Sequence, residues 1–192
     1  DSFNSGDWFN RLDWTYQDNA WGSGLPVASK NQDNWPIFQP LLADPALAVS
    51  TAEIQSTARH FREMLEIRKS SRLFRLTTGD DVRERVEFLN VGPGQVPGLI
   101  AMSIVDREGA IDPAREQVLV VFNANDEAQA FSHPSLVGAD LVLHPVQRAS
   151  ADPVVRAAAF DGATGTVTVP ARTTAVFEGA AAPDHCEAVE VL

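Results

Sequence analysis

The sequence has little cysteine, little positive charge and no long apolar run. Its single cysteine, Cys186, can form no internal disulfide and offers no pair of thiolate metal ligands. Lys and Arg number 15 against 26 Asp and Glu, so the formal net charge is −11 at pH 7. A chain this acidic repels the phosphates of nucleic acids and anionic lipids, so neither is expected as a partner. No apolar run approaches the roughly 20 residues that span a bilayer.

Tryptophan and tyrosine are missing from most of the chain. The four tryptophans and Tyr16 all lie within residues 1–35, among many Gly, Pro, Asn and Asp residues. No helical or alternating period runs through residues 1–48, so we expect turns with aromatic anchors that pack on protein outside this chain. The chain opens on Asp1 and shows no signal-peptide pattern. We therefore expect a piece of a longer, soluble protein, with any targeting signal upstream and the localisation open.

One long helix is predicted over about residues 51–70. Ser50 lies three residues before Glu53, which is the spacing of a capping box. Basic residues follow in the last turn, where they suit the helix dipole. Apolar residues recur at helical spacing and are expected to lie in a hydrophobic core. They are Ile54, Ala58, Phe61, Met64, Leu65 and Ile67.

From Leu73 onward the apolar period changes to two, which predicts strands. Seven or eight short strands separated by turn residues favour an antiparallel β-sandwich. The last residues, from about Ala180, read as a poorly packed tail. The candidate strands are residues 82–88, 99–105, 117–123, 128–131, 141–146, 154–160, 166–169 and 173–177.

The first fourteen residues combine acids, amides, an arginine and aromatic side chains around Gly6. This mixture suits sugar recognition, because carboxylates and guanidinium groups bind vicinal hydroxyls and indole faces cover a pyranose ring. The alternative is a surface loop with aromatic anchors and a structural Asp–Arg ion pair. His60 is expected to face solvent or to form an internal hydrogen bond, and His133 and His144 have no second ligand at metal spacing, so no metal site is assigned.

Several long motifs then occur in one order along nearly the whole chain. Together they resemble pullulanases and limit dextrinases, which are starch-debranching enzymes of the α-amylase family (glycoside hydrolase family 13). The motifs are DSFNSGDWFNRLDWTYQDNAWGSGLP at residues 1–26, NQDNWP at 31–36, IRKSSRLFRL at 67–76, RVEFLNVGPGQVPGLIAMSI at 85–104, VVFNA at 120–124, LHPVQ at 143–147 and TGTVTVPARTTAVF at 164–177.

The resemblance implies a mainly β chain with a defined organisation. Residues 1–72 are expected to be the last loop and last helix of a catalytic (β/α)8 barrel, and residues 73–179 a C-terminal antiparallel β-sandwich domain. Residues 180–192 are the tail. One barrel helix cannot close an eight-stranded barrel of about 250 residues, so the chain alone is expected to be inactive.

The resemblance also implies the chemistry of the intact enzyme. Such enzymes are retaining glycosidases that hydrolyse α-1,6-glucosidic linkages in pullulan, limit dextrins or branched α-glucans without an organic cofactor. Their catalytic acids all precede the region present here, and this sequence has no His-Asp pair. No catalytic residue is therefore assigned. The SGDWFNR motif places Asp7 and Arg11 on glucose hydroxyls, although some relatives carry Lys at the Arg11 position.

Two other roles stay open for the sandwich. It could be a free-standing carbohydrate-binding module, but residues 73–179 contain no Trp or Tyr to form a sugar platform. It could instead be purely structural and cover the barrel. The structural role is favoured. The expected partners are an α-glucan, bound through the intact enzyme, and the upstream barrel.

Overall fold

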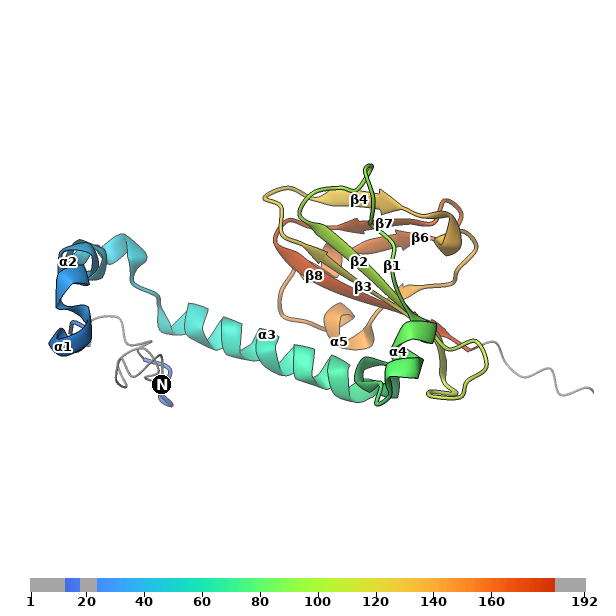
Figure 1. Cartoon of the computed structure of the whole chain (residues 1–192), viewed down its shortest axis with the longest axis horizontal. Coiled ribbons are helices and arrows are strands. Elements are labelled where there is room, and N and C mark those ends of the chain that lie inside the picture. The colour runs from blue at the N-terminus through green and yellow to red at the C-terminus, as the bar shows by residue number, and fades with distance from the viewer. Residues whose placement is uncertain (1–12, 18–23, 182–192) are drawn as a thin grey trace, which may run out of the picture. The chain divides into compact units, whose positions relative to one another are not determined.

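A computed structural model describes residues 13–17 and 24–181 of the chain (Figure 1). The chain divides into two compact units, Asp1–Arg62 and Glu63–Leu192. The division falls within the long helix α3 (Thr51–Ser70). No helix among the described residues is long and apolar enough to cross a membrane.

The first unit contains short helices that the sequence pattern did not predict. They are α1 (Ala28–Asn31), η2 (Gln32–Asn34), α2 (Trp35–Ala43) and η3 (Pro45–Leu47). The expectation of turns alone was wrong for these residues. Local signals start two of these helices: proline occupies the first turn of α2, and Asp44 caps η3 by accepting the N–H of Ala46. Elements this short leave no measurable helical period.

Helix α3 is confirmed, and its capping box forms as predicted. The Ser50 N–H donates to Glu53 Oε2 at 2.7 Å, and the Glu53 N–H donates to Ser50 Oγ at 3.3 Å. The hydrogen bond from the Ser50 backbone holds the pKa of Glu53 below its usual value. The N-terminus of this helix is therefore fixed by local sequence alone.

The apolar residues of α3, predicted to form one stripe, lie on two different faces of the helix. Ile67 is buried against Val120 and Val176 of the sandwich. Phe61 and Leu65, expected in the core, are 64% and 49% exposed in this chain. Leu65 lies two residues from Ile67, which is about 200° around the helix axis. The expectation failed because one helix cannot turn both sets toward the same sheet.

Between α3 and the sandwich lie η4 (Arg72–Arg75), α4 (Gly79–Arg85) and β1 (Val86–Phe88). The predicted strand over residues 82–88 was therefore wrong at its first half. Thr78 Oγ1 accepts the N–H of Asp81 at 3.0 Å and caps α4. Acids in its first turn and arginines in its last turn favour the helix and outweigh the alternating pattern.

The predicted antiparallel sandwich is confirmed. A five-stranded sheet in the order β1-β2-β3-β8-β5 faces a three-stranded sheet in the order β4-β7-β6, and every pair is antiparallel. The remaining strands are β2 (Leu99–Val105), β3 (Arg115–Asn123), β4 (Gln129–Ser132), β5 (Val142–Leu143), β6 (Ala159–Asp161), β7 (Thr166–Val169) and β8 (Thr173–Ala180).

Three short helices interrupt the sandwich loops and shorten predicted strands. They are η5 (Pro134–Leu136), α5 (Pro145–Arg148) and η6 (Val155–Ala157). Proline opens both η5 and α5, where its missing N–H costs nothing. The predicted strands at residues 141–146 and 154–160 were thus too long.

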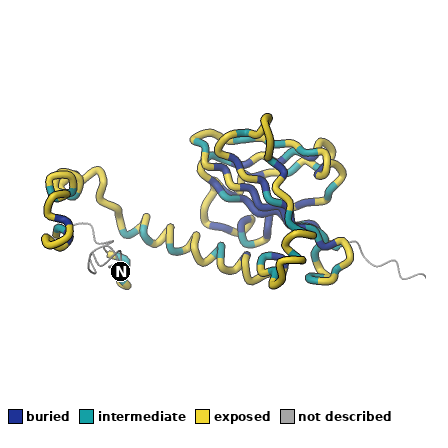
Figure 2. Tube along the Cα trace, viewed as in Figure 1, coloured by how far each residue is buried: buried dark blue, intermediate teal, exposed yellow. Residues whose placement is uncertain are grey.

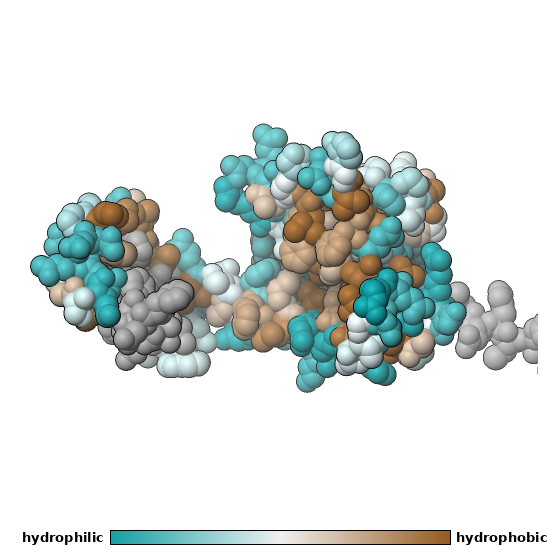
Figure 3. Space-filling model, viewed as in Figure 1, coloured by the Kyte–Doolittle hydropathy of each residue, from teal (hydrophilic) through white to brown (hydrophobic). Residues whose placement is uncertain are grey.

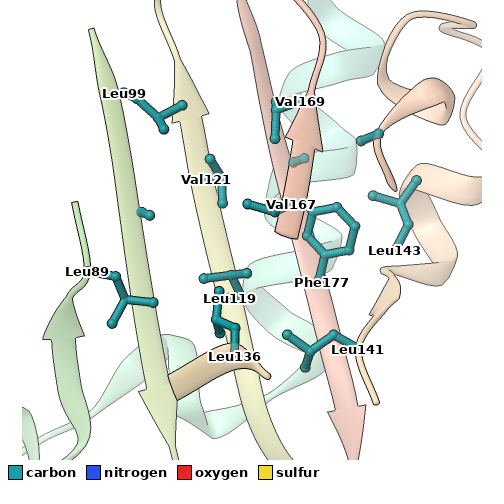
Figure 4. Packing of buried hydrophobic residues seen from close by; sticks show 13 residues of the cluster. Leu89, Leu99, Leu119, Val121, Leu136, Leu141, Leu143, Val167, Val169 and Phe177 are labelled. Atoms are coloured by element: carbon teal, nitrogen blue, oxygen red, sulfur yellow. The ribbon is translucent and has the colours of Figure 1, made fainter. Parts of the chain in front are cut away.

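The core lies between the two sheets, where the buried strands run dark blue in Figure 2. Phe177 of β8 is fully buried at its centre and contacts Phe160 of β6 with ring centroids 6.3 Å apart. Figure 4 shows side chains of both sheets pointing into this layer. The labelled members are Leu89, Leu99, Leu119, Val121, Leu136, Leu141, Leu143, Val167, Val169 and Phe177.

The opposite face of the five-stranded sheet is only partly covered. Ile67 and Leu73 are buried against one part of it. Phe88, Ile100 and Phe122, which the strand register places on the same face, remain exposed. Figure 3 shows apolar surface gathered over this sheet. We call Phe88, Ile100 and Phe122 the outer-face patch.

Candidate functional site

The two predicted sugar-binding residues, Asp7 and Arg11, lie outside the described residues. The nearest described segment is residues 13–17, which begins two positions after Arg11, the last residue of the SGDWFNR motif. Asp13 organises this segment, because its carboxylate accepts the N–H of Thr15 at 2.9 Å and of Gln17 at 2.8 Å. Asp13 thus builds a tight turn at the end of the motif.

Helix α3 holds this turn. Arg62 Nη2 donates to Tyr16 Oη at 2.9 Å, and Thr51 Oγ1 donates to Gln17 Oε1 at 3.4 Å. Tyr16 has φ of 59°, a left-handed conformation that is uncommon for a tyrosine. The first half of α3 therefore holds residues 13–17 in place.

The tryptophans of this region differ in their environments. Trp35 Nε1 donates to the Pro26 carbonyl at 2.8 Å, so Trp35 is a local anchor. Trp14 is 82% exposed and presents its indole to solvent. Trp8 and Trp21 lie outside the described residues. An exposed indole beside the motif can cover a sugar ring or pack on another protein surface.

Two of the described histidines cap short helices. His133 Nδ1 accepts the N–H of Ser135, and His144 Nδ1 accepts the N–H of Val146. Within residues 13–17 and 24–181, no group of three or more His, Cys, Asp or Glu could hold a metal ion. His133 and His144 thus each have a structural role at a helix start.

No sequence pattern predicted the polar cluster around Arg115 at the start of β3. Its Nε donates to Glu178 at 2.7 Å, and its Nη1 lies 3.2 Å from Asp112. Although burial opposes it, the pKa of Asp112 is lowered by hydrogen bonds from Ser71 and the Ala114 N–H and by the charge of Arg115. Burial acts to lower the pKa of Arg115, but the two carboxylates raise it. One arginine thus lies between two carboxylates and joins the turn before β3 to β8.

A groove of about 570 Å³ lies beside the ends of β2, β3 and β8. Its lining includes Glu87, Glu116 and Asp140, with Arg107 as the one basic side chain among the described lining residues. None of the described residues that line it is aromatic. It therefore lacks the flat apolar face on which sugar rings stack.

Fold and site together define a class: an antiparallel β-sandwich module that follows a long helix and a polar, aromatic N-terminal segment. The chain belongs to the pullulanase-type C-terminal family, because the family model described as "Alpha-1,6-glucosidases, pullulanase-type, C-terminal" matches residues 16–179.

Individual relatives agree with this assignment. The chain is 46% identical over 183 residues to Pullulanase 1, chloroplastic, of Arabidopsis thaliana and covers 19% of that protein. It is 34% identical over 184 residues to Pullulanase of Klebsiella pneumoniae and covers 16% of that protein. These matches cover 92% and 93% of the present chain. The chain thus spans less than a fifth of the length of these two relatives.

A solved structure shows the same fold. The crystal structure of a maltotriose complex of PulA from Klebsiella pneumoniae matches with a TM-score of 0.81 and 33% identity. The match covers 95% of this chain and 20% of that one. The resemblance to pullulanases seen in the sequence is confirmed, as is the mainly β fold.

Proposed function

We propose that this chain is the C-terminal part of an enzyme that hydrolyses α-1,6-glucosidic linkages in pullulan, limit dextrins or branched α-glucans. The family match over residues 16–179 is the observation that carries the proposal. The chain contributes part of the substrate cleft and a structural domain. A retaining glycosidase needs two carboxyl groups about 5–5.5 Å apart, and the resemblance puts both upstream of this chain.

Asp7 and Arg11 are the proposed contribution to the cleft. A carboxylate and a guanidinium four residues apart can together bind neighbouring hydroxyls of one glucose unit, with charge-assisted hydrogen bonds. Residues 13–17, which come soon after these two positions in the sequence, are bound to α3 by the hydrogen bond from Arg62 to Tyr16. A relative's structure, titled as a maltotriose complex, is consistent with this role.

The intact enzyme tests this role. Asp7→Ala should lower kcat/KM for pullulan by about tenfold or more, because a hydrogen bond to a charged group is lost. Arg11→Lys should retain more activity than Arg11→Ala if the positive charge matters more than the paired N–H donors of the guanidinium group. Asp126→Ala is the control, since Asp126 pairs with Arg172 on the exposed surface. Unchanged kcat and KM in Asp7→Ala would refute the role.

The upstream barrel is the proposed partner of the exposed apolar residues. Residues 1–72 would form the end of the barrel, and residues 73–179 the sandwich that covers it. Phe61 and Leu65 lie on the side of α3 turned away from Ile67, and their burial elsewhere would recover hydrophobic free energy. About four-fifths of the length of the relatives lies outside this chain, so the missing polypeptide is large enough to cover them.

Reconstitution tests this partnership. The purified chain alone should release no reducing sugar from pullulan, and mixing it with the upstream part should restore activity. Phe61→Asp should weaken reconstitution at least tenfold, because it places a charge in the contact. Val137→Asp is the control, since Val137 is similarly exposed beside η5. Activity of the chain alone, or equal reconstitution by both variants, would contradict the proposal.

A further inference from the structure

The LHPVQ motif at residues 143–147 opens a segment that joins the sandwich to α3. His144 is 2% exposed and stands at the N-cap of α5, where its Nδ1 accepts the Val146 N–H at 3.2 Å. Pro145 follows in the first turn, with its backbone angle already suited to a helix. The motif therefore fixes the position of one imidazole ring inside the fold.

The ring of His144 reaches the last turn of α3. Because Nδ1 accepts a hydrogen bond, the proton of the neutral ring lies on Nε2. Nε2 is 3.0 Å from Ser70 Oγ, which in turn donates to the Ile67 carbonyl at 2.8 Å. The hydrogen bonds thus run in one direction, from the cap of α5 into the helix.

A second contact holds α3 two turns earlier. Ser150 Oγ lies 2.9 Å and 3.0 Å from the two carboxylate oxygens of Glu63, and Ser150 is buried. Glu63, Ile67 and Ser70 follow one another at i, i+4 and i+7, so they share one face of the helix. Polar contacts therefore hold both ends of this face, and Ile67 packs against the sheet between them.

Gln147 keeps the segment in place on the sheet. Its fully buried side chain donates to the Thr174 carbonyl at 2.8 Å and accepts the Val176 N–H at 2.7 Å. The His144 N–H also donates to the Val176 carbonyl, at 2.8 Å. The segment is therefore attached to β8 by three hydrogen bonds and cannot slide along it.

We propose that residues 143–150 form a latch in which His144 and Ser150 act as positioning residues that set the rotation and axial position of α3 on the sandwich. The inference extends the proposed function, because the face of α3 held by the latch is opposite the one that carries Leu65. Because the latch fixes the rotation of α3, the helix face that carries Leu65 can meet the upstream part of the protein in only one orientation.

Protonation of His144 opens the latch. A protonated Nδ1 can no longer accept the Val146 N–H, and Glu178, whose Oε2 is 3.5 Å from Nε2, is already bound to Arg115. Burial lowers the pKa of His144, Arg115 and Arg148 lower it further, and Glu178 acts against them. The charged groups around the ring and the latch are Glu178, Arg115, Asp112, Arg148 and Glu63.

Amide hydrogen exchange of the 192-residue chain at pH 7 tests the latch. The rate over residues 64–70 is compared with the rate over β8, which reports opening of the whole sandwich. Ser150→Ala should speed exchange at residues 64–70 by about two- to tenfold relative to β8. His144→Ala should do at least as much. His133→Gln is the matched control, because His133 caps η5 in a similar His-Pro arrangement.

The pH dependence separates a latch from general loss of stability. After correction for intrinsic exchange, opening of residues 64–70 should increase from pH 7 to pH 5 in the original chain. His144→Gln keeps a donor near Ser70 but cannot be protonated, so whatever its exchange rate at pH 7, it should abolish this increase. Equal acceleration over β8, or an unchanged pH profile in His144→Gln, would overturn the proposal. No substrate is involved, so failure of the sugar-binding role would leave this result unaffected.

Discussion

Arg85 Nη1 donates to Asp106 Oδ1 at 2.9 Å, and the carboxylate that receives it is completely buried. Asp106 also accepts the N–H groups of Ile111 and Asp112, at 2.9 Å and 2.8 Å. The last residue of α4 is thereby joined to the turn that follows β2. A buried charge satisfied by three donors is stable only while its partners are present.

Replacing Asp106 should consequently be costly. Asp106→Ala should lower the free energy of unfolding by about 3–5 kcal/mol, because Arg85 Nη1 and two backbone N–H groups would lose their acceptor and only Asp81, 3.6 Å from Arg85 Nε, would still face the buried guanidinium. Urea unfolding measures the change. Asp126→Ala, which breaks the exposed pair with Arg172, should cost less than about 1 kcal/mol. Similar losses in the two variants would show that burial does not control the effect.

Phenylalanines on the two faces of the five-stranded sheet should respond differently to truncation. Phe177→Ala should cost about 3–5 kcal/mol, since it leaves a cavity in the core. Phe122→Ala should cost about 1 kcal/mol in this chain, because Phe122 of the outer-face patch is 41% exposed. Thermal and urea unfolding of both variants would reveal the difference. Equal costs would mean that the patch is already covered within this chain.

Gly165 should tolerate no side chain. Its φ is 62°, and an added Cβ would lie 2.8 Å from the His133 carbonyl oxygen and 2.8 Å from the Val137 nitrogen. Gly92 also has a positive φ, of 85°, but its added Cβ would meet nothing within 4 Å. Gly92→Ala should cost about 1–2 kcal/mol for the backbone alone. Gly165→Ala should cost about 1–3 kcal/mol more, measured by urea unfolding, unless the loop can move aside.

Acid should weaken the sandwich through Asp112. Its folded-state pKa lies below the ordinary value of 3.8, so the ionised form favours the folded chain. This stabilisation is complete above about pH 4 and is lost as the pH falls through the folded pKa. Asp112→Asn should therefore be less stable than the original chain at pH 6, and the gap should narrow at pH 3. A constant gap at both values would contradict this assignment.

Sequence patterns predicted the elements whose signals are local and repeated. The Ser50–Glu53 pair marked the start of α3, and alternation of apolar residues marked β2, β3 and β8. The sequence could not show that the apolar residues of α3 divide between two faces. That division depends on which side of the helix meets the sheet, and the sheet lies far along the chain.

The polar contacts were harder to predict for the same reason. Ser150 lies 87 positions from Glu63, and Glu178 lies 63 positions from Arg115. Sequence spacing cannot predict contacts between residues that come together only when the sandwich folds. The α4 helix was missed for another reason: Thr78 and its following acids form a cap only one turn long, within a stretch that also alternates. Asp7 and Arg11 rest on motif resemblance and stay predictions.

Gln147 has a consequence for how separate molecules behave toward one another. Beyond the two-residue strand β5, the edge of β8 would expose the Thr174 carbonyl and the Val176 N–H, and unpaired groups of this kind recruit strands from other chains. The amide of Gln147 occupies both groups, as a neighbouring strand would. A single side chain thus protects this edge against intermolecular sheet growth, and Gln147→Leu should make the protein prone to fibrillar aggregation.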